Sequence, residues 1–288
     1  MACSGALFQD GSLTRALNIA VVAAALICAS SGRAAEVRDD TGRLVSLPHP
    51  ARRIVTLAPH ATELVLAAGA RARLVAIANG RDAPQSLAAL PQLGGPGGTD
   101  REALLALQPD LVIAWQSGNR ASDLDWIERT GIAVFRSEPR SLADVADAIL
   151  AIGELSDTSQ AASQAAAAFH QAVATPCAGL PLQAAYVTVW DRPEMTVGGL
   201  HWINSVLRSA GYRNVFDGLP RGVFRPSPEA VLANHRLPQI SLMRRFDAST
   251  GDRLADLLSR PGPRLGRAVQ LLCARRLAES RAAVREPG

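Results

Sequence analysis

The sequence predicts an α/β protein of two Rossmann-like lobes with parallel sheets, joined by a long interlobe α-helix. Short apolar runs and helical segments alternate in both halves of the chain, and this alternation is typical of mainly parallel sheets. A long Ala-rich helical stretch separates the two halves. At 288 residues, the chain is long enough for two lobes with a core each.

The N-terminus has the residue order of a secretory signal peptide. Arg15 precedes an uncharged apolar run over residues 16–29, and small residues follow up to Ala34 and Ala35. The run is shorter than the ~20 residues that a membrane-spanning helix needs. We therefore predict that residues 1–35 are removed on export, with cleavage after Ala34 or Ala35, and that the mature chain has no transmembrane helix.

The first lobe is expected over residues 36–140. Each of its helical segments opens with a plausible cap or an acidic first turn, and a buried apolar run precedes it. The expected strands cover residues 53–57, 74–77, 111–115 and 132–135, and the expected helices cover residues 62–69, 99–107 and 122–130.

Residues 141–175 are predicted to connect the lobes as one or two long helices. Neither Gly nor Pro occurs between Ser141 and Gly153, and a second Ala-rich stretch runs from Asp157 to Ala174. The pattern of the first lobe then resumes in the second, which is expected over residues 176–288. Its expected elements are a strand over residues 184–190, helices over 202–210 and 229–233, and a weak strand over 237–242.

Composition and motif spacing exclude several classes of function. All 30 basic residues are Arg, so chemistry that needs a lysine is absent. The net charge of +4 is spread without a basic block, so no nucleic-acid partner is expected. The five His lack the spacing of metal ligands, and no catalytic signature of paired carboxylates, Ser/His/Asp or Cys/His stands out. These observations favour a binding protein that is not an enzyme and has no metal site.

The four cysteines form no CxxC motif and no Cys/His cluster. Removal of the signal peptide takes away Cys3 and Cys28. Cys177 and Cys273 then remain in an oxidising compartment, where the sequence leaves their pairing open. Lipidation of Cys28 also stays open, although the preceding Ile27 is bulky where a small residue is expected.

One local motif occurs in both lobes. Thr99–Ile113 contains a capped short helix that leads through Gln-Pro into a strand, and Ser227–Ala233 leads toward Pro238–Ile240 in the same way. Glu102 and Glu229 lie in the first turn of these helices, where the helix dipole favours a carboxylate. On this pattern alone, the two motifs are capping boxes.

Four stretches give the chain a family resemblance: Arg53–Leu64, Leu105–Asn119, Ser227–Leu232 and Arg260–Arg264. On these stretches, residues 37–275 resemble the periplasmic substrate-binding proteins of iron-siderophore, haem and cobalamin ABC transporters, and most of all the cobalamin-binding branch. The resemblance implies a monomeric periplasmic protein that holds a ligand in a cleft between two lobes joined by a long helix.

The resemblance also implies a ligand and partners. Cobalamin or another corrinoid would be delivered to the permease subunits of an inner-membrane ABC importer, with no cofactor of the protein's own. In the family, one surface Glu on each lobe docks in an Arg pocket of the transporter, and Glu102 and Glu229 hold the matching positions.

Two alternatives to a corrinoid carrier stay open. The first is a ferric siderophore or haem as the ligand. Haem is disfavoured, because its carriers usually have an axial Tyr in the first lobe, whereas Tyr186 and Tyr212 both lie in the second. The second alternative is an enzyme or a sensor on the same scaffold.

A corrinoid is a large amphipathic ring with amide arms, so its site should combine flat apolar walls with a few polar groups. Trp115, at the end of a strand, and the turn to Asn119 are expected in the cleft; the alternative for Trp115 is a core position under a loop. His60 takes a position that faces the cleft in the family, with a surface or cap role as its alternative. Asp256 and Arg260 match positions that meet the ligand's polar edge, although their i, i+4 spacing also makes an ordinary helix pair.

Several aromatic residues of the cobalamin-binding branch are missing. Gly80 stands where an aromatic ligand contact is expected, and Met195 and Val223 replace two others in the second lobe. Trp190 and Phe224 are close to these positions in the sequence, so we expect Trp190, Met195 and Phe224 to contact the ligand; the alternative is that the ligand is a different one.

Two further departures concern the second lobe. The family's usual disulfide partner for Cys273 falls at Ala210, which argues against a bridge from Cys177. The stretch from Ile240 to Asp256 is short where the family fits another helix and strand, so the second lobe is expected to lack a layer.

Overall fold

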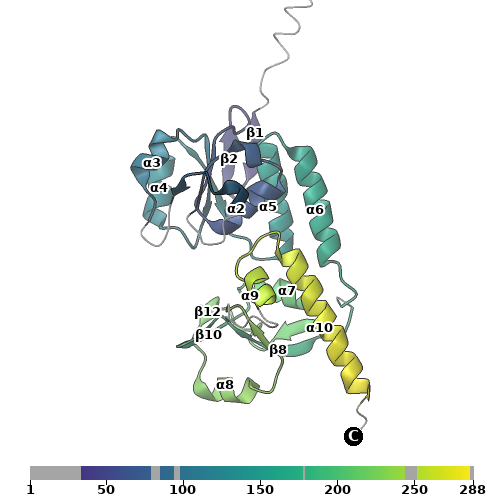
Figure 1. Ribbon diagram of the computed structural model, residues 1–288. Coiled ribbons are helices and arrows are strands. Elements are labelled where there is room, and N and C mark those ends of the chain that lie inside the picture. The colour runs from purple at the N-terminus through teal and green to yellow at the C-terminus, as the bar shows by residue number, and fades with distance from the viewer. Residues whose placement is uncertain (1–33, 79–84, 94–97, 178, 244–251, 286–288) are drawn as a thin grey trace, which may run out of the picture.

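The computed structural model describes residues 34–78, 85–93, 98–177, 179–243 and 252–285. Figure 1 shows an upper lobe and a lower lobe, with long helices along one side of both. Both lobes combine parallel sheets with helices, as the sequence predicts. In the described residues, no helix has the length and apolar character to cross a membrane.

Lobe one is built on a parallel sheet in the order β5-β4-β3-β6-β7. Alternate residues of β6 point to opposite faces: Leu111 and Ile113 pack with α2 and α5, whereas Val112 packs with α3 and α4. This two-sided burial explains the continuous apolar runs that predict the strands. The strands are β3 (Ile54–Thr56), β4 (Leu74–Ala78), β5 (Gln92–Leu93), β6 (Leu111–Trp115) and β7 (Ala133–Ser137); the helices are α2 (Pro59–Ala67), η1 (Arg71–Arg73), η2 (Gln85–Leu87), α3 (Arg101–Ala106), α4 (Ala121–Arg129) and α5 (Leu142–Leu155).

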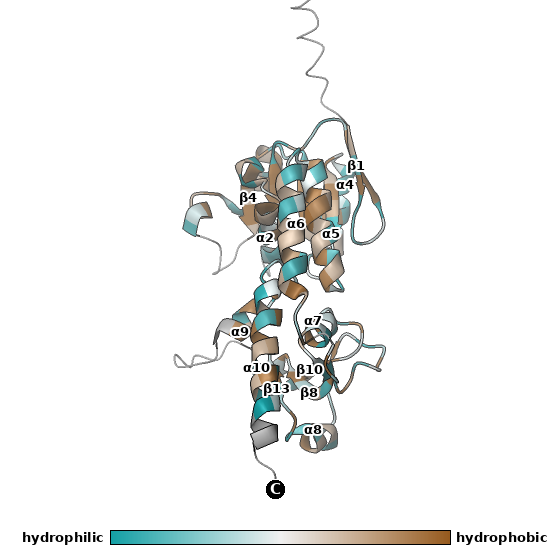
Figure 2. Cartoon of the chain, turned by 90° about the vertical axis from the view of Figure 1, so that its right-hand side faces the viewer, coloured by the Kyte–Doolittle hydropathy of each residue, from teal (hydrophilic) through white to brown (hydrophobic). Residues whose placement is uncertain are grey.

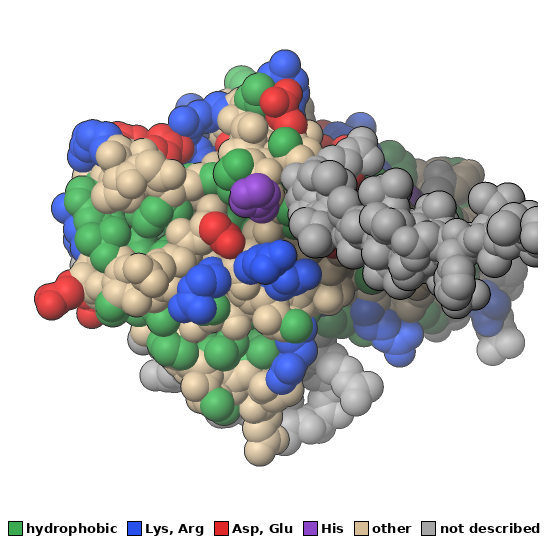
Figure 3. Space-filling model, turned by 90° about the horizontal axis from the view of Figure 1, so that it is seen from above, with side chains coloured by type: hydrophobic (Ala, Val, Ile, Leu, Met, Phe, Trp, Pro, Cys, Tyr) green, Lys and Arg blue, Asp and Glu red, His purple; other side chains and the backbone are tan. Residues whose placement is uncertain are grey.

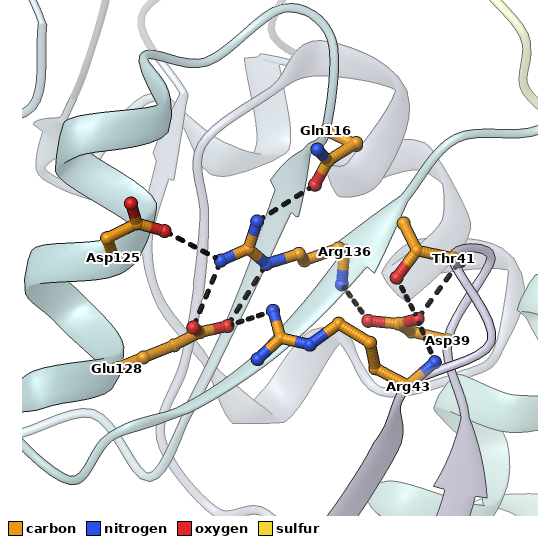
Figure 4. Close-up of polar contacts among 7 residues, drawn as sticks. All are labelled: Asp39, Thr41, Arg43, Gln116, Asp125, Glu128 and Arg136. Carbon is orange, nitrogen blue, oxygen red and sulfur yellow. Dashed lines mark hydrogen bonds and ion pairs between the residues drawn. The ribbon is translucent and has the colours of Figure 1, made fainter.

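An antiparallel hairpin of β1 (Ala35–Arg38) and β2 (Leu44–Leu47), absent from the expected elements, precedes this sheet. Its turn is held by Asp39, whose Oδ1 accepts hydrogen bonds from Thr41 and from the backbone N–H of Arg43. Figure 4 shows how the hairpin joins lobe one: Arg43 and Arg136 converge on Glu128, at 2.6 and 3.0 Å. The Arg136 backbone N–H also donates to Asp39.

The expected interlobe segment forms two helices, one of the two arrangements that the sequence predicts. α5 ends at Leu155, and after three residues α6 (Ser159–Val173) runs back beside it toward lobe two (Figures 1 and 2). A Cβ atom on Gly153 would lie 2.3 Å from Cβ of Ala162, so this glycine permits the close approach of the two helices. α6 in turn packs on α10 (Leu265–Arg285), a helix that the sequence prediction does not include.

Lobe two is smaller than lobe one. Its parallel sheet has three strands in the order β11-β8-β13, and a three-stranded antiparallel ribbon, β12-β10-β9, lies beside it. The prediction that this lobe lacks a layer concerns the stretch from Ile240 to Asp256, of which residues 244–251 lie outside the described residues. The strands are β8 (Gln183–Thr188), β9 (Trp190–Asp191), β10 (Glu194–Val197), β11 (Tyr212–Asn214), β12 (Val223–Phe224) and β13 (Gln239–Ser241); the helices are α7 (Ile203–Ser209), α8 (Pro228–Asn234) and α9 (Asp252–Leu257).

A disulfide between Cys177 and Cys273 fastens the start of lobe two to α10. The family comparison of positions argues against this bridge, and that prediction is wrong. Cys177 lies beside Gly211, the neighbour of Ala210, so it approaches Cys273 from the region of the family's usual partner position. Both cysteines are buried.

Candidate ligand-binding cleft

A cleft of about 830 Å³ lies between the two lobes. Lobe one contributes the ends of β6 and β7, where parallel sheets usually present ligands. A cavity of about 650 Å³ at the opposite end of the lobe-one sheet is lined by that lobe alone. The residues that line the interlobe cleft are Trp115, Ser117, Glu138, Pro139, Arg140, Val189, Gly199, Leu200, His201, Trp202, Gly222, Val223, Leu242, Ser259 and Pro261.

Trp115 lines this cleft, as the sequence predicts. Its indole packs against the backbone of Gly118, where a Cβ atom would lie 2.0 Å from the ring. Asn119 holds the same turn: its side-chain oxygen accepts from the Trp115 backbone N–H at 2.7 Å, and its amide donates to the Leu57 carbonyl at 3.0 Å. Asn119 is absent from the cleft lining, so it positions the turn and the tryptophan.

His60 lies beneath Trp115 and is only 1% exposed. The two rings meet edge to face with centroids 5.4 Å apart. Ser137 Oγ lies 3.2 Å from His60 Nε2 and donates to Asp40, so His60 serves as the donor to Ser137. Burial, together with the positive charge of Arg260, lowers the pKa of His60 to about 4, and the ring is therefore neutral at pH 7. His60 supports the cleft wall from below and is no surface residue.

Asp40 ends this buried chain of polar contacts. Its carboxylate accepts from the Glu138 backbone N–H at 2.6 Å and from Ser137 Oγ at 3.3 Å. Burial raises the pKa of Asp40 to about 6, against the lowering effect of these two hydrogen bonds. The β1–β2 hairpin is thereby connected to the wall that carries His60 and Trp115.

Asp256 and Arg260 belong to an ionic cluster between the lobes instead of the cleft lining. Glu63 of α2 lies 3.5 Å from Arg260 Nε and accepts two hydrogen bonds from Arg264, at 2.5 and 3.0 Å. Asp256 lies 3.4 Å from Arg264 Nη1. Because these charges engage one another, the cluster ties lobe one to the segment after α9, while Ser259 and Pro261 of that segment reach the cleft.

The three expected aromatic or sulfur contacts of lobe two do not line the cleft. Trp190 and Met195 are opposite each other in the β9–β10 pair, and Trp190 is 56% exposed. The Phe224 ring lies 5.5 Å from that of Phe216. Successive side chains of a strand point to opposite sides, so Val223 takes the cleft side in place of Phe224.

Lobe two instead lines the cleft with the loop before α7, whose Leu200, His201 and Trp202 are not among the predicted site residues. A Cβ atom on Gly198 or Gly199 would lie 2.6 or 2.2 Å from a backbone oxygen of the 217–221 segment, so only glycine allows this packing. The Gly-Gly pair between a strand and a helix was the sequence signal that could have indicated this loop. Gly80, the remaining predicted contact, lies outside the described residues.

Glu102 and Glu229 occupy equivalent places on α3 and α8. Each helix is capped by a side chain that accepts from the backbone N–H three residues on, Asp100 at 3.0 Å and Ser227 at 3.2 Å. Both glutamates are exposed, and hydrogen bonding to backbone and to Ser227 lowers the pKa of Glu229. The two helices lie on the side of the molecule away from α6 and α10 (Figure 1).

The charges at the outer end of lobe one are mixed. Figure 3 shows Arg side chains interspersed there with Asp and Glu and with apolar groups, without a single basic patch on this face.

Two α/β lobes around a ligand-sized cleft, with a helical connection along one side, define a two-lobed solute-binding protein. Residues 54–270 match the model of the periplasmic binding protein family, and the chain belongs to this family.

Particular relatives share more of the sequence. The chain is 31% identical over 230 residues to the vitamin B12-binding protein of Vibrio vulnificus strain CMCP6, covering 72% of this chain and 83% of the relative. It is 30% identical over 254 residues to the vitamin B12-binding protein of Vibrio cholerae strain O395, covering 81% of this chain and 92% of that relative.

Solved structures agree with this placement. The periplasmic vitamin B12-binding protein BtuF of Vibrio cholerae superposes with a TM-score of 0.69 at 28% identity, over 78% of this chain and 96% of that one. The periplasmic haem-binding protein HutB of Vibrio cholerae shares the fold, with a TM-score of 0.62 at 20% identity over 77% of this chain and 97% of that one.

Proposed function

We propose that the mature protein, exported to the periplasm by its N-terminal signal, binds cobalamin or another corrinoid between its lobes and delivers it to an inner-membrane ABC importer. The cleft carries this proposal, because its volume of about 830 Å³ lies within the usual ~300–1,000 Å³ of small-molecule sites. The names of the relatives with about 30% identity support a corrinoid in particular.

The chemistry of the cleft walls fits an amphipathic ring with amide arms. Trp115 faces the cleft from lobe one, and Leu200 and Trp202 face it from lobe two, so flat and apolar surfaces are available on both sides. Arg140 and His201 supply polar groups among them. The protein would need no cofactor and no catalysis for this role, since the ligand is held and released unchanged.

A ferric siderophore is the second candidate. The cleft lacks the aromatic residues expected at the Met195 and Val223 positions, and Arg140 offers a cation to an anionic chelate. Haem is less suited, because the hydroxyls of Tyr186 and Tyr212 are bound to Glu194 and Glu279 and neither residue lines the cleft.

Docking on the permease would use Glu102 and Glu229. Two exposed carboxylates at matched positions on two lobes suit a partner with a pair of equivalent Arg pockets. Each is followed three residues on by an exposed leucine, Leu105 at 45% and Leu232 at 69%, so both contact areas are part apolar.

A calorimetric titration of the mature protein, residues 36–288, tests the ligand. We expect saturable one-to-one binding of cyanocobalamin with a sub-micromolar Kd, and much weaker binding of haemin and of a ferric hydroxamate. Tight binding of the hydroxamate without binding of cyanocobalamin would move the assignment to the siderophore. Circular dichroism on the same sample shows that the protein is folded.

A further inference from the structure

The loop before α7 places one histidine in the cleft wall of lobe two. His201 lines the cleft together with Leu200 and Trp202, and its ring centroid lies 4.9 Å from that of Trp202. Trp115 of lobe one lines the same cleft. So far its imidazole has been described only as one of the polar groups of the cleft wall, without a defined interaction.

One ring nitrogen of His201 is already engaged by the fold. Nδ1 accepts a hydrogen bond from the backbone N–H of Ile203, in the first turn of α7, at 3.2 Å. An accepting Nδ1 carries no proton, so the proton of the neutral ring is on Nε2. Burial lowers the pKa of His201 to about 4, which keeps this neutral form at pH 7.

The position of the loop is fixed by a buried amide pair. Asn204 Nδ2 donates to the carbonyl oxygens of Gly198 and His201, at 2.8 and 3.0 Å. Asn214 donates to Asn204 Oδ1 at 3.1 Å and to the Val197 carbonyl at 2.9 Å. Both asparagines are at most 3% exposed, so this buried hydrogen-bond network holds the backbone at His201 in place.

The outer nitrogen of His201 has no such partner. In the part of the chain that the structure describes, no protein group accepts a hydrogen bond from Nε2. A ligand that fills the cleft displaces water from this donor, and a buried donor without an acceptor is costly. The ligand is therefore expected to supply that acceptor.

We propose that His201 is a specificity-determining contact of the cleft, whose Nε2–H donates a hydrogen bond to an oxygen acceptor of the bound ligand. This inference rests on the proposed function and names the acceptor chemistry, an amide carbonyl or a phosphate oxygen of the corrinoid. His201 is not assigned as a ligand of the corrinoid metal. Metal binding at Nε2 would require the proton on Nδ1, where it would oppose the Ile203 N–H.

Two substitutions of His201 distinguish the role of Nδ1 as an acceptor from the role of Nε2 as a donor. His201→Asn keeps an acceptor for the Ile203 N–H but cannot reach the place of Nε2, whereas His201→Gln returns an N–H donor near that place. We expect His201→Asn to weaken cyanocobalamin binding about three- to tenfold and His201→Gln to restore most of the loss. His170→Asn, on the exposed side of α6, is the matched control and should leave Kd unchanged.

The titration of the wild-type protein tests the proposed function, and the variants test the inference. Dicyanocobinamide lacks the nucleotide loop: an equal loss with this probe places the acceptor on an amide arm, and no loss places it on the nucleotide phosphate. If cyanocobalamin and dicyanocobinamide bind the wild type and His201→Asn with equal Kd, the inference is wrong while the proposed function stands.

Two other results would also overturn the inference. A failure of His201→Gln to restore affinity, with thermal unfolding unchanged, would rule out the donor. A shift of the visible bands of bound cyanocobalamin between wild type and His201→Asn would indicate metal ligation instead. If the wild type binds only the ferric hydroxamate, the same variants are titrated with it, because its oxygens are also acceptors.

Discussion

At the scale of single residues, the indole of Trp115 is held by the backbone of Gly118 and the edge of His60, and it still lines the cleft. A ring fixed in this way loses little conformational freedom when a ligand stacks on it, so its contact area adds directly to affinity. The buried polar chain below it, from His60 through Ser137 to Asp40, supports the same wall.

Replacement of this indole tests its role in binding. We expect Trp115→Ala to weaken cyanocobalamin binding by ~1–3 kcal/mol, since an aromatic face is lost from the wall of the cleft. Trp190→Ala is the matched control, because Trp190 is exposed on the β9–β10 ribbon outside the cleft lining. Calorimetry gives both Kd values. Equal affinities of Trp115→Ala and wild type would assign Trp115 to the core.

The buried neutral state of His60 predicts a pH dependence of stability. Its pKa of about 4 lies below the ordinary 6.5, so the stability it contributes is present above pH 6.5 and is lost as the pH falls toward 4. Asp40, with a raised pKa of about 6, acts with the opposite sign, since its protonated form is favoured in the fold. We expect His60→Leu to lose less stability than wild type between pH 6.5 and 4.5.

Urea unfolding at several pH values measures this difference. Asp40 is present in both proteins, so its contribution cancels when the change of unfolding free energy with pH is compared between wild type and His60→Leu. His170→Leu, which removes an exposed histidine of α6, should retain the wild-type slope. If the free energy of unfolding of His60→Leu falls with decreasing pH as steeply as that of wild type, the neutral, buried state of His60 is contradicted.

At the scale of elements, the contact between α2 and the segment after α9 carries the charged link between the lobes. Glu63, Arg260 and Arg264 are 12–19% exposed at their side chains, so solvent screens them less than surface pairs. Removal of one partner leaves a poorly hydrated charge behind. The cluster therefore stabilises the contact between the two lobes.

A double-mutant cycle measures this link. For Glu63→Ala and Arg264→Ala, urea unfolding should give a coupling energy of about 1–3 kcal/mol. The pair of Arg208 and Asp217, 3.7 Å apart with side chains 55% and 23% exposed, is the surface control and should give less than about 1 kcal/mol. Similar couplings for the two pairs would show that the interlobe cluster is no stronger than a surface pair.

Elements with local apolar periodicity could be predicted from the sequence, and those made by long-range contacts could not. β6 was predicted over residues 111–115, as observed, because burial on both faces leaves a continuous apolar run. The β1–β2 hairpin has charged residues in short strands, and its link to Arg136 spans about a hundred residues. α10 is an exception: it buries Leu265, Ala268, Val269 and Leu272 at the i, i+3, i+4 and i+7 spacing of a helix face, so its local pattern was present and was missed.

The same distinction holds for the cleft. Trp115 was predicted because it ends a recognisable strand, but the choice between Val223 and Phe224 depends on how β12 pairs with β10. The ionic role of Arg260 depends on Glu63, which lies in the other lobe. Such contacts are set by the packing of the lobes, and local sequence carries no signal of them.

At the scale of the whole molecule, the two glutamates proposed for docking lie on one side of the lobes, and the long helices α6 and α10 lie on the other. α3 in lobe one and α8 in lobe two both lie on the side away from α6 and α10 (Figure 1), each with an exposed Glu next to its cap. Neither glutamate is among the residues that line the cleft, so the proposed docking surface and the proposed ligand site share no residue. Loss of the two glutamates should therefore leave ligand binding intact.

The combined variant Glu102→Ala with Glu229→Ala tests this separation. We expect the Kd for cyanocobalamin to stay at the wild-type value, while uptake of labelled cyanocobalamin by cells that express only the variant falls more than tenfold. The reason is that each carboxylate would lose a charge-assisted pairing with an Arg of the permease, a contact worth about 1.5–3 kcal/mol at each of two sites. Glu36→Ala with Glu154→Ala removes two exposed glutamates elsewhere and should leave both measurements unchanged. Weakened ligand binding in the first variant, or undiminished uptake, would remove Glu102 and Glu229 from the docking surface.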